Sequence, residues 1–366
     1  MRAARAGDDG SANCPYVVMR VLFLATNPPS TEASTRYRIA QYFPALYAAG
    51  HSPTLSTFFG DPDARPRWAR VGGGLVQRAV DIARAGSFDV AVIHRELLPH
   101  AWNQPVFLLR EQVPIVFDFD DTVFLQMRTG WRHTLSCPES TRRLVAAACV
   151  VFAGNDYLAE YARSFSNRVE ILPTVVDTRA YRPSPRAATD VPVVGWVGSP
   201  TTAQYLEPVL PVLDELAREF RFRLRIVGAG RAIRMNNIEV ECPAWHADDE
   251  AALFRDLDIG LYPLVDDAWT RGKCGFKAIQ YMASGVASVV SPVGVVRQIV
   301  RDGIDGIWAD TPAQWRCALA DLLRNVDARV RMGAEGRARI EAAYSLAAVA
   351  PRFIAGLERA AATQAR

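Results

Sequence analysis

Eight short, almost wholly apolar segments recur along this 366-residue chain, and they constrain its fold more than any other feature. The first, residues 16–25, is rich in β-branched side chains and is soon followed by two prolines. Such a run is typical of a strand that helices bury on both faces. The other runs cover residues 90–93, 115–119, 150–153, 193–197, 224–227, 259–262 and 287–290. Because helical patterns lie between most of them, the sequence predicts a parallel α/β architecture.

The length and the position of the prolines predict two domains. A chain of 366 residues with 50% hydrophobic residues can form two cores of ordinary size. A proline-rich stretch with little apolar periodicity separates two halves of similar length and is typical of a linker. We therefore expect two Rossmann-like, doubly wound parallel-sheet domains that face a cleft, over residues 16–175 and 193–345. Residues 1–15 are expected to form a disordered tail, 176–192 the linker, and 346–366 a terminal helix whose packing against the N-terminal domain is left open.

Charge and cysteine usage narrow the partners and the compartment. The net charge of +3 arises from 42 basic and 39 acidic residues spread along the chain, which is not the footprint of a DNA- or RNA-binding protein. The six cysteines show neither a CxxC pair nor metal-ligand spacing, so we expect reduced thiols in a cytoplasmic protein and no metal site. No apolar run approaches the roughly eighteen residues that span a bilayer. Peripheral contact with the inner face of the membrane is left open.

The chain has only two lysines, Lys273 and Lys277, and both fall within one five-residue stretch. The surrounding residues predict a helix that begins near Gly275 and ends at Gly285. A cation in the first turn of a helix opposes the helix dipole unless an anion offsets it, and the free N–H groups there also attract an anion. We therefore expect this segment to bind a diphosphate, with Gln280 hydrogen-bonded to a sugar hydroxyl. The alternative is that two surface lysines and a solvated glutamine lie together by chance.

The same segment opens a longer motif. Residues 273–294 (KCGFKAIQYMASGVASVVSPVG) resemble the donor-binding signature of family 4 retaining glycosyltransferases, which have the GT-B fold. Further segments resemble that family in the same order, namely residues 34–46, 169–183, 224–230, 258–264 and 291–295. The resemblance covers nearly everything from residue 16 to residue 357. It implies that the first domain lies on the acceptor side and that the second binds a nucleotide sugar.

The resemblance also implies a reaction. A hexosyl group would pass from a nucleotide diphosphate sugar to an acceptor hydroxyl, with retention of configuration and with neither a metal nor another cofactor. The acceptor is expected to be a glycan, a lipid-linked glycan or a small molecule, in polysaccharide or glycoconjugate biosynthesis. Lys273 is expected to stabilise the leaving diphosphate and is one of two catalytic candidates. The positions expected to bind the donor are Gly198, Ser199, Lys273, Gly275, Phe276, Lys277 and Gln280.

Two departures from the family pattern bear on activity. The family commonly has two glutamates eight positions apart, where this chain has Gly272 and Gln280. It also often has an arginine and a lysine in the loop that here comprises residues 198–202, which contain no cation. Lys273 is then expected to bind the diphosphate alone, or together with Arg36 and Arg38 from across the cleft. These losses leave open a catalytically inactive binding subunit.

In the first domain, two charged clusters follow predicted strands at the edge where parallel sheets bind ligands. Asp120 matches a family position that usually holds a histidine in contact with the donor sugar, and it is the second catalytic candidate. The strand over residues 90–93 is followed by a charged cluster of His94, Arg95 and Glu96, which is expected to face the cleft. The alternative for the aspartates is a loop of turn-forming and helix-capping residues.

Residues 118–122 (DFDDT) also match the nucleophile loop of haloacid-dehalogenase-type phosphatases. In that alternative Asp118 would attack phosphorus, Asp120 would act as acid and base, and Mg²⁺ would bridge both carboxylates. The remaining motifs do not occur in the order that this phosphatase family requires, because the acidic pair Asp266 and Asp267 precedes Lys273 instead of following it.

A last segment, residues 66–74, combines two arginines and Trp68 with three consecutive glycines. We expect a solvated surface loop here. Contact with an acceptor or with an anionic membrane is the alternative.

Overall fold

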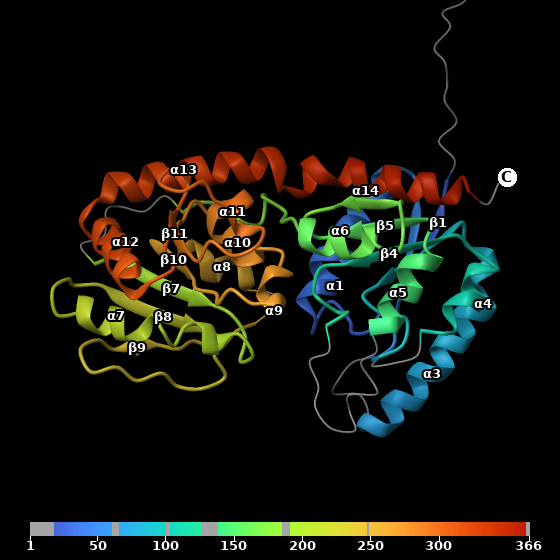
Figure 1. Ribbon diagram of the computed structural model, residues 1–366, viewed down its shortest axis with the longest axis horizontal. Helices are drawn as coiled ribbons and strands as arrows, with labels where there is room; N and C mark the ends of the chain where they lie inside the picture. The colour runs from blue at the N-terminus through green and yellow to red at the C-terminus, as the bar shows by residue number, and fades with distance from the viewer. Residues whose placement is uncertain are drawn as a thin grey trace, which may run out of the picture.

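The computed structural model describes residues 18–60, 66–99, 103–125, 138–184, 191–246 and 249–363. The tail expected over residues 1–15 and the middle of the expected linker, residues 185–190, lie outside these residues. The described chain forms two α/β domains side by side, with the last two helices running along one side of both (Figure 1).

The N-terminal domain contains a six-stranded sheet of spatial order β2-β1-β3-β4-β5-β6, in which all pairs are parallel. Its strands are β1 (Arg20–Ala25), β2 (Ser52–Thr57), β3 (Val90–His94), β4 (Ile115–Phe119), β5 (Val150–Ala153) and β6 (Val169–Ile171). Its helices, with two 3₁₀ turns, are α1 (Ala33–Arg38), η1 (Ala40–Tyr42), α2 (Phe43–Ala48), α3 (Arg67–Ala83), η2 (Ala85–Ser87), α4 (Val106–Arg110), α5 (Pro138–Ala147) and α6 (Asp156–Arg163). Alternate strand residues enter two separate cores, Leu22 and Phe117 in one, Phe23 and Val116 in the other.

The C-terminal domain repeats this plan with the order β12-β11-β10-β7-β8-β9, again with parallel pairs. Its strands are β7 (Val193–Val197), β8 (Arg223–Val227), β9 (Val240–Glu241), β10 (Ile259–Tyr262), β11 (Ala287–Val290) and β12 (Ile307–Trp308). Its helices are η4 (Ala203–Tyr205), α7 (Leu210–Leu216), α8 (Glu250–Arg255), α9 (Ala268–Arg271), α10 (Phe276–Ala283), α11 (Val296–Ile299), α12 (Pro312–Arg324) and α13 (Val326–Ala343). The predicted fold of two facing parallel α/β domains is confirmed.

The strands that the sequence analysis missed are β2, β6, β9 and β12, and all four are edge strands. β2 reads SPTLST, and the other three have two or three residues whose side chains are all partly exposed. An edge strand pairs on one side only and is less buried than a central strand, so no continuous apolar run marks it.

The final helix, α14 (Leu346–Ala361), returns to the N-terminal domain, whereas α13 packs on the C-terminal one (Figure 1). The crossing point is held where Val176 accepts from the Leu346 N–H at 2.8 Å and donates to the Tyr344 carbonyl at 3.2 Å. Phe353 then packs in the core of the first domain, with ring centroids 5.6 Å from Phe152 and 6.3 Å from Phe23.

Residues 66–74 do not form the surface loop that was expected, because α3 begins at Arg67 and includes all three glycines. A Cβ on Gly74 would collide with Phe58, so this glycine lets the helix lie close to the end of β2. Arg78 and Asp81 are buried and pair at 2.9 Å, which anchors the helix to the domain. Tertiary contacts thus override the weak helix propensity of glycine.

Candidate functional site

A cavity of about 870 Å³ lies between the two domains. On the C-terminal side, the loops after β7 and β8, the end of β10 and the start of α10 line it. On the N-terminal side, the lining residues are Thr31, Ala33, Arg95, Asp120 and Asp121. Both sets follow the carboxyl ends of parallel strands, where open α/β sheets bind ligands. The volume is within the range of small-molecule sites, about 300–1,000 Å³.

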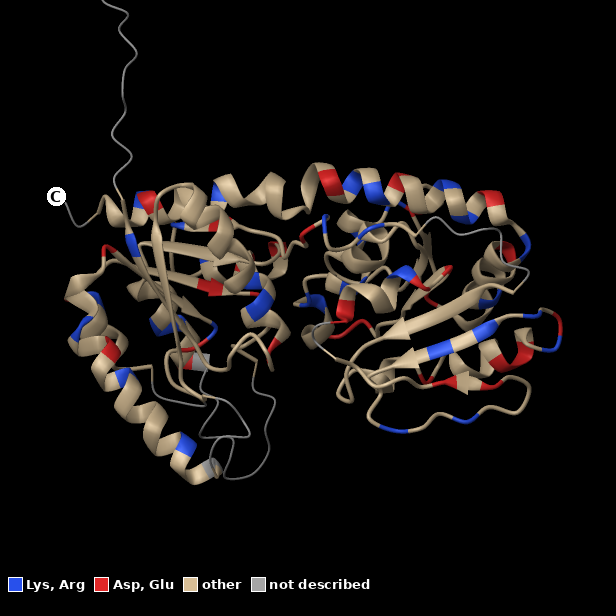
Figure 2. Cartoon of the chain, turned by 180° about the vertical axis from the view of Figure 1, so that it is seen from behind, with Lys and Arg blue, Asp and Glu red and all other residues tan. Residues whose placement is uncertain are grey.

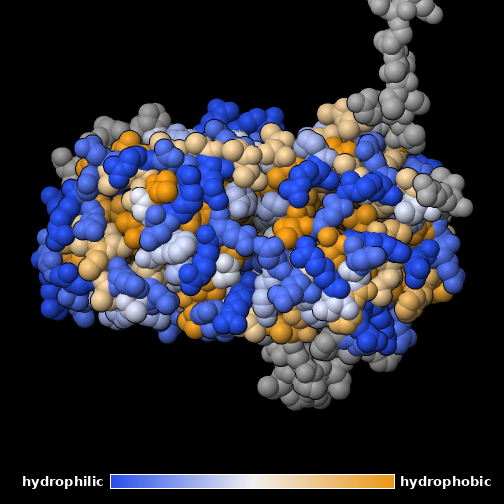
Figure 3. Space-filling model, turned by 45° about the horizontal axis from the view of Figure 1, so that its top comes forward, coloured by the Kyte–Doolittle hydropathy of each residue, from blue (hydrophilic) through white to orange (hydrophobic). Residues whose placement is uncertain are grey.

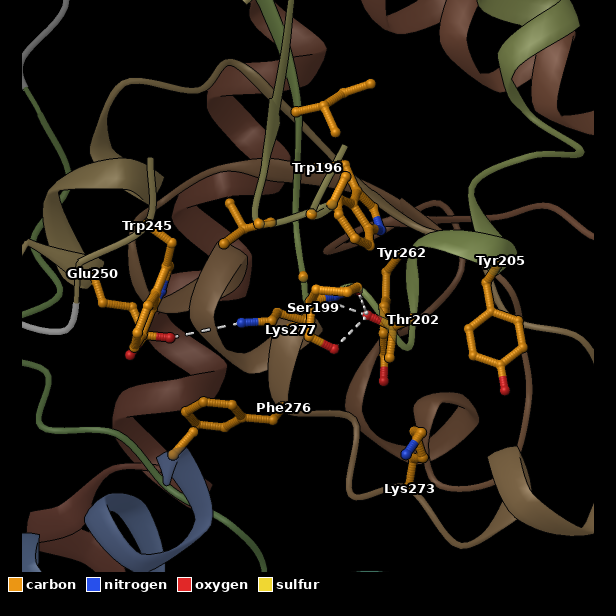
Figure 4. A pocket seen from close by; sticks show the side chains of 18 of the residues that line it. Trp196, Ser199, Thr202, Tyr205, Trp245, Glu250, Tyr262, Lys273, Phe276 and Lys277 are labelled. Carbon is orange, nitrogen blue, oxygen red and sulfur yellow. Dashed lines mark hydrogen bonds and ion pairs between the residues drawn. The ribbon is translucent and has the colours of Figure 1, made fainter. Parts of the chain in front are cut away.

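The structure brings six of the eleven predicted site residues to this cavity. Those on its wall are Gly198, Ser199, Asp120, Lys273, Phe276 and Lys277. Figure 4 shows Ser199, Lys273, Phe276 and Lys277 around it. The five that are not on its wall are Gly275, Gln280, Arg36, Arg38 and His94.

The signature segment forms the predicted helix, α10, with Gly275 at its N-cap and Gly285 just after its end. Gly275 has a φ of 64°, and a side chain there would collide with Ile299, so the position requires glycine. The first amides of an α-helix have no partner within the helix. The first two residues of α10, Phe276 and Lys277, line the cavity, so this amide end faces the site.

Lys273 is held between a carboxylate and an aromatic ring. Its Nζ is 3.6 Å from Asp121 Oδ2 of the first domain and 4.4 Å from the centroid of the Trp269 ring. An ammonium has three donors, so these two contacts leave capacity for an anionic ligand.

The anion that offsets Lys277 in this structure is Glu250. Glu250 Oε1 is 3.7 Å from Lys277 Nζ (Figure 4), and Lys277 also donates to Gln280 Oε1 at 2.9 Å. Burial lowers the pKa of Lys277, and the carboxylate of Glu250 opposes this effect. The expectation that a cation here needs an anion therefore holds, but the protein itself supplies one. Glu250 begins α8, and no motif in the sequence marked it.

Arg36 and Gln280 bind Glu250 instead of facing the cavity. Arg36 donates to Glu250 Oε2 at 2.8 Å. Its side chain therefore reaches across the cleft, but it binds a carboxylate of the protein there. Gln280 is fully buried and donates to Glu250 Oε1 at 3.1 Å and to the Tyr181 hydroxyl at 2.7 Å. The amide of Gln280 is therefore engaged inside the protein, which does not fit the expected contact with a sugar hydroxyl.

Arg38 and His94 lie in the interior of the first domain, in a cluster around Asp118. Arg38 donates to both oxygens of Asp118, through Nη2 to Oδ1 and through Nε to Oδ2 at 3.2 Å. His94 places Nδ1 2.8 Å from Asp118 Oδ2 and Nε2 2.7 Å from Ser34 Oγ. All four residues are buried. The expectations that Arg38 extends to the diphosphate and that His94 faces the cleft are corrected by this cluster, because a buried carboxylate needs a cation and further hydrogen-bond partners beside it.

The same cluster argues against the phosphatase alternative. The nucleophile would be Asp118, which is 1% exposed and has both oxygens engaged. Among the described residues, no group of three or more His, Cys, Asp or Glu side chains is arranged to hold a metal ion.

Asp120 lies on the cavity wall with both oxygens hydrogen-bonded. Arg95 Nε donates to Oδ1 at 2.7 Å, and the Ser34 hydroxyl donates to Oδ2 at 2.6 Å. Burial alone would raise the pKa of Asp120, but Arg95, with His94 and Arg38, holds it well below its usual range. A general base works best with a pKa near the operating pH, so Asp120 is poorly suited to accept a proton. Its fixed charge suits electrostatic stabilisation instead.

Arg95, the neighbour of His94, is the member of that predicted cluster that lines the cavity. Its φ of 61° is the only positive φ of a non-glycine residue among the described residues. The Arg95 N–H donates to the Asp118 carbonyl at 2.8 Å, which holds this uncommon conformation. The guanidinium then meets Asp120 and, at 3.0 Å, Glu32. The sequence indicated this charged cluster. Which of its side chains faces the cavity depends on the backbone conformation at Arg95.

Four aromatic residues on the wall were not predicted: Trp196, Tyr205, Trp245 and Tyr262 (Figure 4). They come from separate parts of the second domain, with Trp196 in β7 and Tyr262 at the end of β10. Aromatic faces of this kind suit a planar ring of a ligand. No sequence spacing links them, so only the folded domain shows that they meet.

The two domains touch closely at Gly272. The Asn155 side chain of the first domain donates to the carbonyls of Gly272 at 2.9 Å and of Lys273 at 3.1 Å. A Cβ on Gly272 would collide with the methyl group of Thr122. A glutamate therefore cannot occupy this position in the observed domain arrangement, which accounts for one of the two departures from the family signature.

Comparison with known proteins agrees with this architecture. Residues 191–325 match the family model described as glycosyl transferases group 1. Among solved structures, sucrose-phosphate synthase from Thermosynechococcus elongatus is similar with a TM-score of 0.69 at 14% identity, over 92% of this chain and 98% of that chain. The HepE protein of Anabaena, in complex with UDP and glucose, is similar with a TM-score of 0.66 at 12% identity, over 93% of this chain and 99% of that chain. No curated protein matches the sequence.

The chain has the fold and the matching domain of a GT-B glycosyltransferase. A glycosyltransferase from Rickettsia africae adds to this, with a TM-score of 0.68 at 10% identity, over 93% of this chain and 98% of that chain. The expected GT-B fold is thereby confirmed, and the family-model match supports a glycosyltransferase. Assignment to family 4 and a retaining mechanism stay predictions. Within the described residues, every helix of this GT-B protein is too short or too polar to span a lipid bilayer.

Gly272→Ala is expected to destabilise the protein by about 1–3 kcal/mol, the usual cost of an overpacked contact. The added methyl group would collide with Thr122, and Thr122→Ser removes the methyl group that it meets. Chemical denaturation should show a loss for the single variant and a partial recovery for the pair. Gly60→Ala is the matched control, because nothing lies within 4 Å of a Cβ built there. Equal losses for Gly272→Ala and Gly60→Ala would contradict the assigned contact.

Glu250→Gln is expected to lower the free energy of unfolding by about 3–5 kcal/mol at neutral pH, because it leaves two cations unpaired in a buried site. Burial alone would raise the pKa of Glu250, but Lys277, Gln280, Tyr37 and Arg36 bring it below its ordinary value. The wild-type advantage is therefore fully present above the ordinary glutamate pKa and disappears as the pH falls through the lowered folded value.

Chemical denaturation at neutral and acidic pH measures this effect. Glu207→Gln is the control, because Glu207 pairs with Arg231 on the surface at 2.7 Å and such pairs contribute about 0–1 kcal/mol. A loss in Glu250→Gln that is no larger than in Glu207→Gln, or that does not shrink in acid, would argue against the role of Glu250.

Proposed function

We propose that the protein transfers a hexosyl group from a nucleotide diphosphate sugar to an acceptor hydroxyl in the synthesis of a polysaccharide or glycoconjugate. The observation that carries this proposal is that both lysines of the chain and the amide end of α10 meet at one interdomain cavity. Ammonium groups and free helix amides together suit a diphosphate. The similar HepE structures hold UDP with glucose, or UDP-glucose, which supports a donor of this class.

The donor is proposed to lie along the second domain. Its diphosphate would be bound by Lys273 and the first amides of α10, and its base would lie against the aromatic part of the wall. The loop after β8 supports this arrangement, since Gly228 and Gly230 have positive φ values and line the cavity without side chains. A Cβ at either position would collide with Gly198 or Pro200, so these glycines let the loops after β7 and β8 lie close together on the donor side of the cavity.

The chemistry is proposed to depend on charge stabilisation. Negative charge develops on the diphosphate as the sugar–phosphate bond breaks, and Lys273 with the α10 amides would stabilise it without a metal ion. Lys277 would contribute less, because Glu250 already neutralises much of its charge. Asp120 would stabilise positive charge that develops on the sugar, in a transfer that retains configuration.

The acceptor is proposed to enter from the side of the first domain, where Thr31, Arg95 and Asp121 line the cavity. A hydroxyl, a guanidinium and a carboxylate can all hydrogen-bond to hydroxyl groups. This supports an acceptor rich in hydroxyls, which fits a glycan, a lipid-linked glycan or a polar small molecule.

A catalytically inactive binding subunit is the second candidate, and one observation favours it. The carboxylate of Glu250 already pairs with Lys277, and neither signature glutamate is present. A thermal-shift screen against UDP-, GDP- and dTDP-sugars finds the donor, since a ligand that binds only the folded state raises its melting temperature. Slow hydrolysis of that donor without an acceptor is expected from an enzyme, whereas a binding subunit would leave it intact.

Lys273→Ala is expected to lower turnover about a hundredfold, as removal of one charge-stabilising donor does in other enzymes. The reason is loss of the ammonium group at the diphosphate. Initial rates with the donor from the screen measure this. Lys273→Arg keeps the charge and is expected to lose less. Unchanged turnover of Lys273→Ala would remove the proposed role.

Chelation with EDTA is expected to leave transfer unchanged, because a lysine and helix amides meet the charge that a metal ion would otherwise neutralise. The same assay with added Mg²⁺ serves as the control and should give the same rate. Loss of activity in EDTA that Mg²⁺ restores would assign the stabilising charge to a metal ion.

A further inference from the structure

Helix α3 turns its apolar side to solvent. Trp68 is 80% exposed, and Val71, Leu75, Val76 and Val80 are also exposed. Trp68, Val71 and Leu75 are separated by three and four residues, and Val76 and Val80, separated by four, lie next to them on the same side of the helix. The opposite side, with Gly74, Arg78 and Asp81, is buried against the domain. A surface helix normally buries its apolar side in the core, so α3 is oriented the other way.

The buried side explains this orientation. Asp81 accepts from Arg78 Nη1 at 2.9 Å and from the Ser56 hydroxyl at 2.5 Å, and Arg78 Nε donates to the Leu97 carbonyl at 3.0 Å. These polar contacts hold α3 on the domain in place of apolar packing. The apolar side is therefore left without a partner among the described residues.

The charges of α3 that remain outside are basic. Its only acidic residue is Asp81, which is fully buried, whereas Arg70 in its first turn and Arg84 just after its end stay partly or largely exposed. Figure 2 shows several blue bands along this helix and a single red one. An apolar stripe flanked by cations is the pattern of a helix that lies in the interface of an anionic membrane.

The apolar surface is concentrated on this one element. Five of the fourteen large exposed hydrophobic residues in the described part of the chain belong to α3. The face in Figure 3, which α13 and α14 cross, instead shows hydrophobic groups (orange) in small patches between hydrophilic ones (blue). In Figure 1, α3 lies at the outer corner of the N-terminal domain, away from the C-terminal domain and clear of the interdomain cavity. A flat surface could therefore contact α3 without closing the site.

We propose that α3 docks the protein on an anionic lipid surface. The valine, leucine and tryptophan side chains enter the acyl boundary, and the flanking arginines contact lipid phosphates. The stripe has no hydrogen-bonding group apart from the indole N–H, which favours a lipid surface over a specific protein partner. This inference does not depend on the proposed transfer reaction.

Flotation of the full chain with vesicles tests the proposal. Vesicles of phosphatidylcholine mixed with phosphatidylglycerol are compared with vesicles of phosphatidylcholine alone. The wild type is expected to bind the anionic vesicles, and to bind them less as salt is raised. Val76→Ser with Val80→Ser is expected to weaken binding about tenfold or more, because two aliphatic side chains leave the stripe.

A matched control exists on α13. Val326 and Val330 have the same spacing as Val76 and Val80, and similar exposure, 42% and 66% against 65% and 48%. Val326→Ser with Val330→Ser is expected to bind vesicles like the wild type. Equal melting temperatures would show that both double variants are folded.

Three outcomes would overturn the proposal. The first is no binding of the wild type to anionic vesicles, and the second is equal binding by all three proteins. The third is a wild-type dimer in solution that Val76→Ser with Val80→Ser dissociates while no protein binds vesicles. That last result would assign the stripe to a second copy of the chain.

Discussion

One buried carboxylate, that of Glu250, binds residues of both domains where the domains meet. It accepts from Arg36 and Tyr37 of the first domain and from Gln280 of the second, and it pairs with Lys277. Charges buried in this way are stable only together, because each alone would lack the solvation of water. The position of Lys277 on the cavity wall, and the contact between the domains beside it, therefore depend on a residue outside the glycosyltransferase signature.

The carboxylates of this site come from other positions than the two that hold glutamates in the family signature. Contact between Gly272 and Thr122 excludes a side chain where the family commonly has a glutamate. Carboxylates reach the cavity from elsewhere instead, Asp120 and Asp121 from the first domain and Glu250 from α8. Basic residues pair with these carboxylates, so the charged part of the wall consists of ion pairs near the N-terminal end of α10.

The sequence was most informative where burial is complete. Each of the eight apolar runs contains a strand, because a strand covered on both faces needs largely apolar side chains. The four edge strands lack that requirement and were missed. The glycines of residues 72–74 suggested a loop, but close packing on Phe58 and the Arg78–Asp81 pair make this segment helical. Local propensity could not anticipate contacts with residues far along the chain.

For the candidate site too, some features follow from the sequence and others only from the fold. By itself, the sequence determined the two α/β domains, the helix that starts after Gly275 and the presence of both lysines at its beginning, since these follow from local pattern and spacing. Only the tertiary structure decided which charges face the cavity and which pair inside the protein. Arg38, His94 and Gln280 carry suitable chemistry but meet Asp118 or Glu250, whereas Arg95 and four aromatic residues reach the wall. The physical reason is that a buried charge or amide must find a partner, and that partner comes from another part of the fold.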